Sequence, residues 1–403
     1  MKTLSARQTK PKTKDETPRS ALDSPLLPLF FALVLGSLIL WQGLISSGWN
    51  PTVFVGADAR WSDARVLGRD FIIDKHSGYD GQFYYRLARD PFTTAETAYG
   101  VKLGSPAYRQ QRILYPFLAW CLSLGKAAWT PWALIAVNLI AFCAIGWLGG
   151  AWARYLGEHA LWGALPLFHL GFTFSLLGNL TEIVEIAFLL GGLLLVEKKR
   201  FGWASLCLCL AVLAKETALP AAVAVAGFTL FAQWQRKQRQ GQFDKLALFL
   251  LLPVTVYFAM QLILLRVWGV MPLIMGNGNL AAPFTSIVFY LAGVVETGWQ
   301  NQSNLEKFRA IGLVGTLAFI GLVLFYIRRS RVSKHLQITW LLFTFLFLCL
   351  SDFVLSVDTH FMRAFSECFV LGVLLLMSAP LRTRFAVIIC VAILNGARSF
   401  LIS

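Results

Sequence analysis

Long apolar runs recur along almost the whole chain, and they constrain its fold more than any other feature. The first run, Leu26–Ile45, has 20 residues and no charge, which is the length that a helix needs to cross a bilayer core of about 30 Å. Hydrophobic residues make up 57% of the sequence and charged residues only 14%, whereas soluble domains carry about 25% charged residues. The sequence therefore predicts an all-α, polytopic membrane protein.

The first run could also be mistaken for a targeting signal. It is longer than the apolar core of a signal peptide, and no A-x-A-like cleavage site follows it. We therefore expect an uncleaved first span. Residues 1–24, which precede it, are rich in Lys, Thr, Ser and Pro, a composition typical of a disordered tail.

Further apolar segments follow the first at short intervals. The candidate spans are 26–45, 131–153, 160–178, 182–196, 201–215, 218–233, 245–267, 309–327, 336–351, 364–379 and 385–397. Two more apolar stretches, 113–125 and 284–297, make the count ambiguous. We predict about 11 transmembrane helices, within a range of roughly 10–13, in a single domain over residues 25–398.

Basic clusters select one topology, because positively charged loops are retained on the cytoplasmic side. With a cytoplasmic N-terminus and 11 spans, all of them fall on that side. The clusters are Arg154, 197–200, 235–240, 328–335 and 382–384. A crossing by 113–125 would move the next two clusters outside, and a crossing by 284–297 would expel 328–335. We therefore expect both stretches to lie at the outer surface or to re-enter, and residues 46–130 to form a long outer loop.

Most of the formal net charge of +15 lies in these clusters, so nucleic acid is not an expected partner. The seven cysteines lie almost entirely inside apolar segments and none has CxxC spacing, which argues against a disulfide framework or a thiolate metal site. The chain also lacks GxxxxGK[ST], HExxH and GxSxG, and its five histidines show no ligand spacing. ATP hydrolysis and zinc proteolysis are therefore not expected.

The outer loop contains the stretch GYDGQFYYRLARDPF, residues 78–92. On a helix, Tyr79 and Tyr84 share an apolar face with Asp80 among them, while Arg86 lies opposite. A carboxylate there is costly unless it is used or paired, and partial desolvation would raise its pKa. The alternative is a helix N-cap. If Ser77 provides the cap instead, Asp80 would point into the membrane interface.

Two further groups in the loop are candidates. Asp58 follows the turn at Gly56, just beyond the first span. Arg109 and Arg112 lie in the aromatic-rich stretch YRQQRILYPFLAW, and arginine suits two-pronged contact with a phosphate. The alternative for both arginines is an interfacial anchor, in which their charged ends reach the membrane surface.

Ionisable residues also cluster at the expected outer ends of later spans. Glu182 and Glu185 are three residues apart and so share a helix face; they form either a functional site or a hydrogen-bonded packing pair. Lys215 and Glu216 close another span. Arg363 enters a span four residues before Glu367, and the alternative to a functional role for it is an internal salt bridge with that glutamate.

This layout resembles that of the GT-C membrane glycosyltransferases. A first span is followed by a long outer loop, which carries a surface helix with an acidic residue, and then by many spans. In glycosylphosphatidylinositol and bacterial mannosyltransferases of that class, an acidic residue beside an aromatic opens a helix, and a YP element follows. GYDGQFYYRLARDPF followed by RILYPFLAW is similar, and LAKETAL, residues 213–219, looks like a segment found in many of these enzymes.

The resemblance implies a transferase that moves a sugar from a polyprenyl- or dolichyl-phosphate donor to a cell-envelope glycan or lipid acceptor on the outer membrane face. Asp80 would be the general base, with Asp58 as the second acidic candidate. The loop has no DxD motif, so no cofactor is carried over with certainty, although a divalent cation is possible. The resemblance and the topology favour a bacterial plasma membrane.

The resemblance also assigns substrate-binding roles. Arg112, Lys215 and Arg363 would hold the phosphate, and Glu182 would position a sugar hydroxyl. The full set of candidate binding residues is Tyr79, Gln82, Tyr84, Arg109, Arg112, Tyr115, Glu182, Lys215, Glu216, Arg363 and Glu367. Two other functions remain open: a flippase or other transporter of lipid-linked oligosaccharides, and a non-catalytic membrane subunit of a polysaccharide assembly complex.

Overall fold

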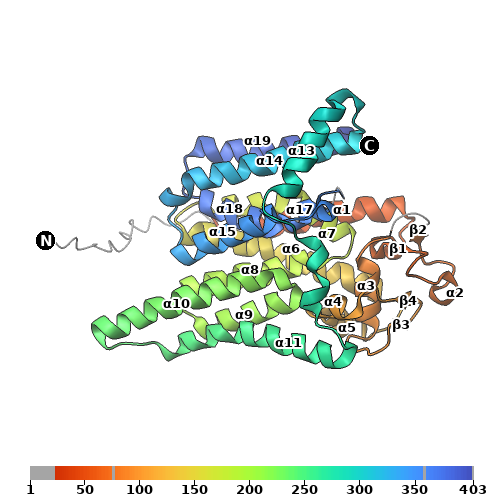
Figure 1. Ribbon diagram of the computed structural model, residues 1–403, viewed down its shortest axis with the longest axis horizontal. Coiled ribbons are helices and arrows are strands. Elements are labelled where there is room, and N and C mark those ends of the chain that lie inside the picture. Colours follow the sequence, from red (N-terminus) through yellow and green to blue (C-terminus); the bar gives the residue numbers. More distant parts are fainter. Residues whose placement is uncertain (1–22, 75–77, 357–359, 402–403) are drawn as a thin grey trace.

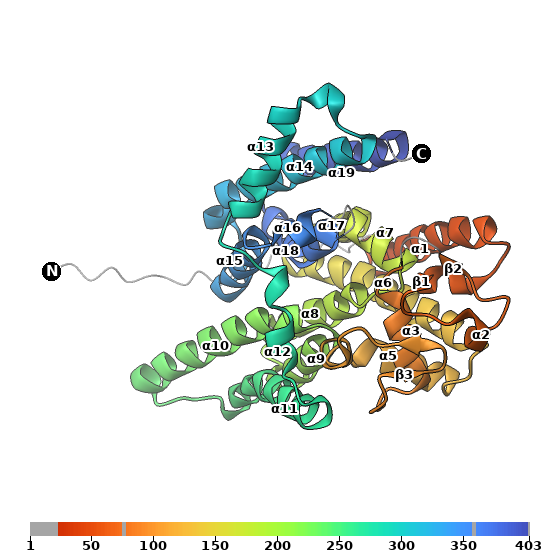
Figure 2. The same ribbon diagram turned by 45° about the vertical axis from the view of Figure 1, so that its right-hand side comes forward.

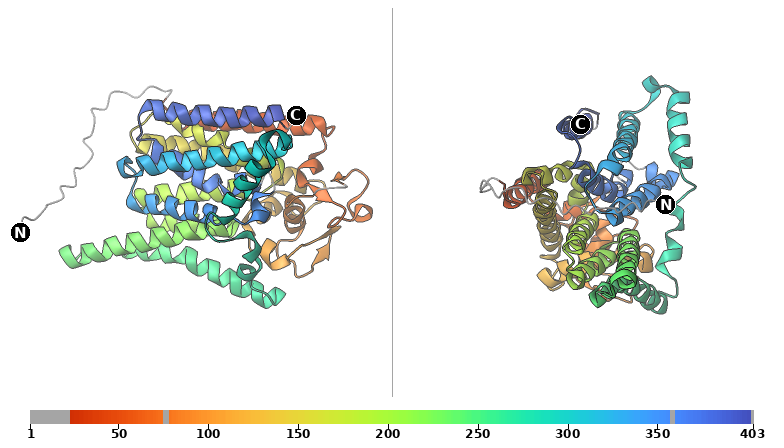
Figure 3. Two further views of the ribbon diagram at one scale, coloured as in Figure 1. Left: turned by 45° about the horizontal axis from the view of Figure 1, so that its top comes forward. Right: turned by 90° about the vertical axis from the view of Figure 1, so that its left-hand side faces the viewer.

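The computed structural model describes residues 23–74, 78–356 and 360–401. Its long helices run side by side, and the region that follows the first helix is gathered at one end of the bundle (Figures 1 and 3). Strands in the described residues are confined to two pairs of two-residue segments. The helical fold class predicted from the sequence is therefore confirmed. Residues 1–22, Ser77 and Asp358 lie outside the described residues.

Five helical stretches in the described part of the chain are long and apolar enough to cross a membrane, or six if one bent pair counts as a span. The five are Leu26–Ser46, Thr130–Tyr155, Glu216–Gln240, Lys245–Trp268 and Asn304–Arg329. They correspond to α1 (Leu26–Ser46), α6 (Thr130–Tyr155), α10 (Leu219–Gln240), α11 (Leu252–Trp268) and α14 (Asn304–Tyr326), some with short 3-10 extensions.

The other bundle helices are shorter or more polar. They are α7 (Leu170–Leu177), α8 (Glu182–Glu197), α9 (Phe201–Ala214), α15 (Lys334–Leu348), α18 (Ser366–Leu376) and α19 (Leu381–Leu401). Each apolar segment predicted as a span overlaps a helix of the structure. The number of membrane crossings stays a prediction.

One predicted span is not a single straight helix. Residues 160–178 form a 3-10 segment, η2 (Ala160–Phe168), followed by α7, with a bend of 63° between them. Pro166 lies inside η2, where it removes a backbone donor and breaks α-helical pairing. A Cβ atom on Gly163 would lie 2.0 Å from the carbonyl carbon of Gly149, so only glycine lets η2 lie this close to α6.

Ion pairs and a carboxylate–imidazole contact tie several helices together at the end of the bundle that carries the basic clusters. Glu158, just after α6, lies 2.8 Å from Arg384 of α19 and 3.7 Å from Arg331. Glu197, at the end of α8, lies 3.4 Å from His335 of α15. The basic residues that the sequence predicts to be on one side of the membrane therefore include several that meet at one end of the structure.

The region between α1 and α6 holds small elements at the opposite end. These are η1 (Pro51–Val55), β1 (Ala57–Asp58), α2 (Ala64–Leu67), β2 (Ile73–Asp74), α3 (Gly81–Arg89), β3 (Thr97–Ala98), β4 (Val101–Lys102), α4 (Pro106–Gln110) and α5 (Leu114–Ser123). β1 pairs with β2 in parallel, and β3 pairs with β4 antiparallel. α5 has ten residues, about 15 Å at 1.5 Å per residue, which is half of the length that a span needs.

The helix that carries the opening motif is more deeply buried than its sequence pattern predicts. Every residue of α3 from Gly81 to Ala88 is buried, including Gln82 and Arg86. The expected division into an apolar face and a polar face is therefore wrong, because α3 packs against α5 and α6 as well as β4. Arg86 stays buried by donating to the Thr93 hydroxyl at 2.7 Å.

A separate segment links α11 to α14 along the outside of the bundle (Figure 2). It contains α12 (Pro272–Met275) and α13 (Thr285–Thr297). α13 covers the apolar stretch 284–297 that made the span count ambiguous. Its 13 residues measure about 20 Å, which is also short of a bilayer core.

Candidate active site

The residues singled out in the sequence converge at the end of the bundle that carries the α1–α6 region. Asp80 comes directly before α3, Glu182 and Glu185 open α8, and Lys215 follows α9. Arg363 lies on α17 (His360–Ala364), just before α18. We call the following nine residues the site cluster: Asp80, Arg109, Arg112, Glu182, Glu185, Lys215, Glu216, Arg363 and Glu367.

Asp80 is held between two arginines. One of its carboxylate oxygens, Oδ2, lies 2.9 Å from the Arg109 guanidinium and 3.9 Å from that of Arg363. Its side chain makes no capping hydrogen bond to α3, so the N-cap alternative does not describe its role. The carboxylate remains partly accessible, at 22% exposure, and can therefore meet a substrate.

The ion pairs also correct the expected ionisation of Asp80. Burial raises the pKa of its carboxyl, but the positive charges of Arg109, Arg363 and Arg112 outweigh burial and lower the pKa to about 2. The sequence-based expectation of a raised pKa is therefore wrong, because it considered desolvation and left out the arginines that tertiary structure supplies.

A glycine brings Asp80 to this position. A Cβ atom on Gly81 would lie 2.4 Å from the Gly178 carbonyl oxygen and 2.8 Å from that of Val55. Any side chain there would push the start of α3 away from the end of α7. Gly81 thus lets the backbone next to Asp80 lie directly against the bundle.

Arg363 connects Asp80 to Glu182, at the start of α8. Its guanidinium lies 3.2 Å from Glu182 and donates to the Tyr79 hydroxyl at 2.6 Å. Glu367, four residues along the chain, is instead 2.9 Å from Lys215. The internal Arg363–Glu367 salt bridge considered from the sequence is therefore absent from the described ion pairs, and Arg363 faces Asp80.

Lys215 is surrounded by carboxylates. Besides Glu367, its ammonium lies 3.6 Å from both Glu182 and Glu185, which confirms that these two glutamates share a face. The Thr217 hydroxyl lies 2.9 Å from Glu185 and 2.8 Å from Glu367. All three glutamates and Lys215 are buried, so the lysine charge is compensated inside the protein by this carboxyl group cluster.

Arg112 forms the other edge of the site cluster. Its Nε donates to Glu216 at 2.8 Å, and a terminal nitrogen pairs with the other oxygen of the same carboxylate. The guanidinium also donates to the hydroxyls of Tyr108 at 2.6 Å and Tyr84 at 3.3 Å. Arg109 and Arg112 thus point into the site and bind carboxylates, which differs from the interfacial-anchor alternative.

The site cluster contains five carboxylates and four cations, and each cation lies within salt-bridge distance of a carboxylate. Donor capacity nevertheless remains. The Nε atoms of Arg109 and Arg363 are buried and have no hydrogen-bond partner among the described residues. Because both atoms are enclosed by protein, an anion beside Asp80 would reach them only if the two guanidinium groups turn toward it.

Asp58 has a structural role in this arrangement. Its carboxylate accepts from the backbone of Arg60 at 2.8 Å and from that of Gly78 at 2.9 Å, and it pairs with the Arg60 side chain at 2.9 Å. Asp58 therefore fixes the backbone two residues before Asp80. The described contacts do not join it to the site cluster, in contrast to the catalytic role considered from the sequence.

Three other predicted binding residues are occupied by internal contacts. Gln82 accepts from the Asp58 backbone at 3.2 Å and from the Ser62 hydroxyl at 2.9 Å. The Tyr115 hydroxyl donates to the Leu134 carbonyl at 3.1 Å, and its ring lies against that of Tyr84. Of the three residues, Tyr84 reaches the site cluster, through its hydrogen bond with Arg112.

Four residues that the sequence analysis did not select also contact the site. The Tyr108 hydroxyl accepts from Arg112, and the Thr217 hydroxyl contacts the buried glutamates. Ser175 donates to Glu182 at 3.3 Å, and the His360 ring packs on Tyr79. Thr217 lies within the quoted LAKETAL segment, so a polar residue at the end of an apolar run was an available signal. Tyr108 likewise opens the quoted stretch YRQQRILYPFLAW, whereas Ser175 and His360 lie outside the quoted motifs.

Among the described residues, no group of three His, Cys, Asp or Glu side chains is arranged to hold a metal ion. Comparisons with protein-family models, with curated proteins and with solved structures found no match for this chain. The function is therefore argued from the geometry of the site cluster and from the motifs in the sequence.

Proposed function

We propose that this protein is a GT-C-type glycosyltransferase. It would move a sugar from a polyprenyl-phosphate-linked donor to a glycan or lipid acceptor at the outer face of the membrane. The observation that carries this proposal is the partly accessible Asp80 carboxylate, held between Arg109 and Arg363 at one end of an apolar bundle. A carboxylate base beside donors for a phosphate leaving group is what such a transfer requires.

The proposed reaction uses Asp80 as the acceptor of a proton. The acceptor hydroxyl oxygen attacks the anomeric carbon of the sugar, its proton passes to the Asp80 carboxylate, and the bond between that carbon and the phosphate oxygen breaks. Polyprenyl phosphate leaves with the bonding electrons. Arg109 and Arg363 would stabilise its negative charge, because guanidinium groups bind phosphate through two parallel hydrogen bonds.

Donor binding would also prepare the base. In the free protein, the two arginines lower the pKa of Asp80, which makes it a weak proton acceptor. A phosphate that draws Arg109 or Arg363 toward itself would remove part of this effect, so the pKa of Asp80 would rise when the donor is bound. The carboxylate would then accept a proton more readily at the moment when the acceptor attacks.

The buried glutamates fit a role in holding the sugar. Glu182 lies 3.2 Å from Arg363 and so borders the proposed phosphate site. A carboxylate there can accept hydrogen bonds from sugar hydroxyls. Lys215 would keep Glu182, Glu185 and Glu367 ionically compensated, and it would act as a positioning residue.

The topology remains part of the proposal. Eleven crossings with a cytoplasmic N-terminus in a bacterial plasma membrane would put the site cluster outside and the Glu158 ion pairs and the Glu197–His335 contact inside. The short lengths of α5 and α13 support their lying at the surface. The placement of the site cluster and the basic clusters at opposite ends of the bundle also supports this orientation.

The transferase proposal has a direct test. The purified protein is incubated with a panel of labelled polyprenyl-phosphate sugars and a matching panel of acceptors. Release of polyprenyl phosphate together with labelled product is the expected result. The thermal unfolding transition shows whether the purified protein is folded. If the folded protein neither hydrolyses nor transfers sugar from any of the donors, the result would argue against a transferase.

One observation favours a transporter instead. Lys215 and three glutamates form a buried charged group between α8, α9 and α18, and ionisable residues inside membrane bundles often line ion or substrate paths. A transporter would move labelled lipid-linked sugar across proteoliposomes without breaking the sugar–phosphate bond. Translocation with no polyprenyl phosphate released would select this second function.

A further inference from the structure

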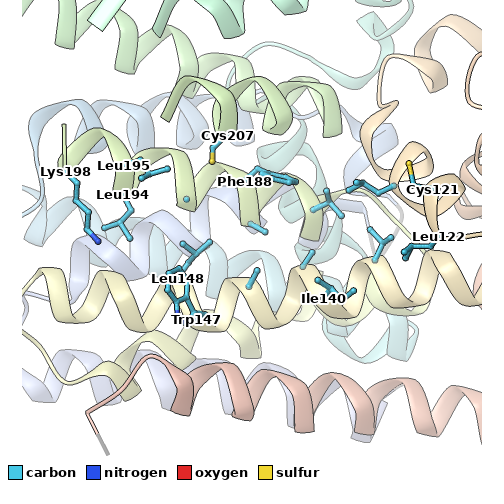
Figure 4. Close-up of a pocket in the computed structure, with 17 residues that line it drawn as sticks. Cys121, Leu122, Ile140, Trp147, Leu148, Phe188, Leu194, Leu195, Lys198 and Cys207 are labelled. Carbon is cyan, nitrogen blue, oxygen red and sulfur yellow. The ribbon is translucent and has the colours of Figure 1, made fainter. Parts of the chain in front are cut away.

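A long apolar groove runs along the side of the bundle, away from the site cluster. Its volume is about 690 Å³, and α5, α6, α8 and α9 contribute its lining (Figure 4). Leu122 lies at one end, Ile140 and Phe188 near the middle, and Lys198 at the other end. Ile140 is 64% exposed, so the groove opens on the outside of the protein.

The groove and the site cluster use different faces of the same helix. Glu182 and Glu185 of α8 turn toward Lys215, whereas Val184, Phe188 and Leu195 line the groove. Val184 and Phe188 are four residues apart and Phe188 and Leu195 seven apart, as residues on one helical stripe are. A ligand in the groove would therefore be separated from Asp80 by the helix itself.

One end of the groove carries a positive charge. Lys198 is its single charged lining residue among those described, and its chain neighbours are Lys199 and Arg200. No carboxylate of the described residues lies within salt-bridge distance of the Lys198 ammonium, and the carboxylate of the adjacent Glu197 lies 3.4 Å from the His335 ring. This end also lies with the basic clusters, opposite the site cluster.

The shape and charge of the groove together define an occupant. The lining extends from Val184 to Lys198, 14 residues apart, which is about 21 Å along a helix and more than the depth of one leaflet of a bilayer core of about 30 Å. We propose that the groove binds an anionic phospholipid of the inner leaflet, with its phosphate on Lys198 and an acyl chain between α6 and α8.

The positions of the charges favour a phospholipid over the sugar donor. The donor proposed above must present its phosphate at the end of the bundle where Asp80 lies. The groove carries no charged lining residue at that end and carries Lys198 at the other. The lipid site does not depend on the transferase proposal, since neither the contacts nor the test involves sugar transfer.

Native mass spectrometry of the purified full-length protein tests the site. Anionic phosphatidylglycerol or zwitterionic phosphatidylcholine is added at matched concentrations, and the fraction of protein with one bound lipid is measured. The wild-type protein should retain the anionic lipid preferentially. Lys198→Asn should reduce this preference about fivefold, as expected for about 1 kcal/mol from one lysine near anionic lipid. Lys199→Asn removes the same charge beside the groove and should change the preference much less.

A second variant tests the apolar part of the groove. Gly191 lines it, and a Cβ atom there would meet neighbours at 3.8 Å or more. Gly191→Leu should therefore fold, occupy the groove and reduce retention of both lipids. Gly202→Leu is the control, because a Cβ atom at Gly202 meets nothing within 4 Å.

Two outcomes would overturn the lipid site. One is equal retention of the two lipids by the wild type, with no effect of Lys198→Asn or Gly191→Leu. The other is a lipid-independent dimer that dissociates in Gly191→Leu, which would show that a second copy of the chain occupies the groove.

Discussion

The Asp80 carboxylate lies 2.9 Å from the Arg109 guanidinium, although 29 positions separate the two residues in the chain. The proposed chemistry needs the Asp80 carboxylate as a proton acceptor, and the neighbouring Arg109 guanidinium lowers its pKa. Arg109 also lies over the Phe83 ring, 4.5 Å from its centroid, so an aromatic side chain fixes one face of the guanidinium. Opening this pair is therefore part of the proposed reaction.

The pH dependence of transfer should reveal the opening of this pair. The kcat/KM profile reports the free enzyme and the kcat profile reports the donor complex. The pKa of Asp80 in the free protein is about 2, so kcat/KM should show no acid limb from this group above about pH 4. The acid limb of the kcat profile should lie at higher pH, because the bound phosphate draws the arginines away from Asp80 and so raises its pKa. Coincident limbs would contradict activation of the base by the donor.

The same pKa predicts how stability depends on pH. A carboxyl whose pKa falls from 3.8 to about 2 on folding stabilises the folded protein above the unfolded value, and this contribution is lost as the pH falls through the folded value. Asp80→Asn should therefore flatten the decline in thermal stability between about pH 4 and 2. An unchanged decline in the variant would mean that the Asp80 ion pairs contribute little to stability.

Arg363→Lys should weaken donor use while the protein stays folded. Lysine keeps the charge but cannot bind phosphate through a planar fork, and charge-assisted hydrogen bonds contribute about 1.5–3 kcal/mol. The KM for the donor should rise about tenfold or more. Arg384→Lys is the matched control, because Arg384 is also largely buried and pairs with Glu158 at the other end of the bundle. An equal rise in KM for both variants would show a general structural effect.

Lys215→Met should destabilise the protein strongly. It would leave Glu182, Glu185 and Glu367 buried without their shared cation, and breaking a buried ion pair costs about 3–5 kcal/mol. The thermal unfolding temperature in detergent should fall sharply. Adding Glu367→Gln to the variant should restore part of the loss, whereas Lys245→Met, at an exposed position, should have little effect. No recovery in the double variant would mean that the charge balance of this group is not the cause.

The orientation of the bundle predicts which residues an impermeant reagent can reach. In a background without the native cysteines, Ser330→Cys should react with an impermeant maleimide only after the membrane is opened. Thr94→Cys, an exposed position of the α1–α6 region, should react in intact cells. Reaction of Ser330→Cys from outside would contradict the proposed topology.

The helices of the bundle could be predicted from the sequence because apolar composition alone identifies segments such as Leu26–Ile45. The bend at His169 was not predicted, although Pro166 is visible in the sequence, and the close approach of η2 to α6 at Gly163 and Gly149 depends on tertiary packing. The burial of α3 from Gly81 to Ala88 was also missed, because helical periodicity shows which residues share a face and does not show how many faces neighbours cover.

The members of the site could be selected from the sequence, but their partners could not. Asp80, Glu182 and Arg363 were each marked by a charge next to apolar residues. Spacing along the chain favoured Arg363 with Glu367, whereas the structure brings Arg363 to Tyr79 and Asp80, more than 280 positions away. Partner choice at such separations is set by tertiary packing, and the wrong pKa direction for Asp80 has the same cause.

The most direct test of the account is the transfer rate of Asp80→Asn with the donor that the panel identifies. Asparagine keeps the size of the side chain but cannot accept the proton, so we predict a folded protein whose transfer is reduced about 10²-fold or more. Asp80→Glu should be intermediate at best, and Asp63→Asn, which changes a capping carboxylate in the same region, should keep nearly full activity. Full transfer activity in a well-folded Asp80→Asn protein would contradict the assignment of Asp80 as the general base.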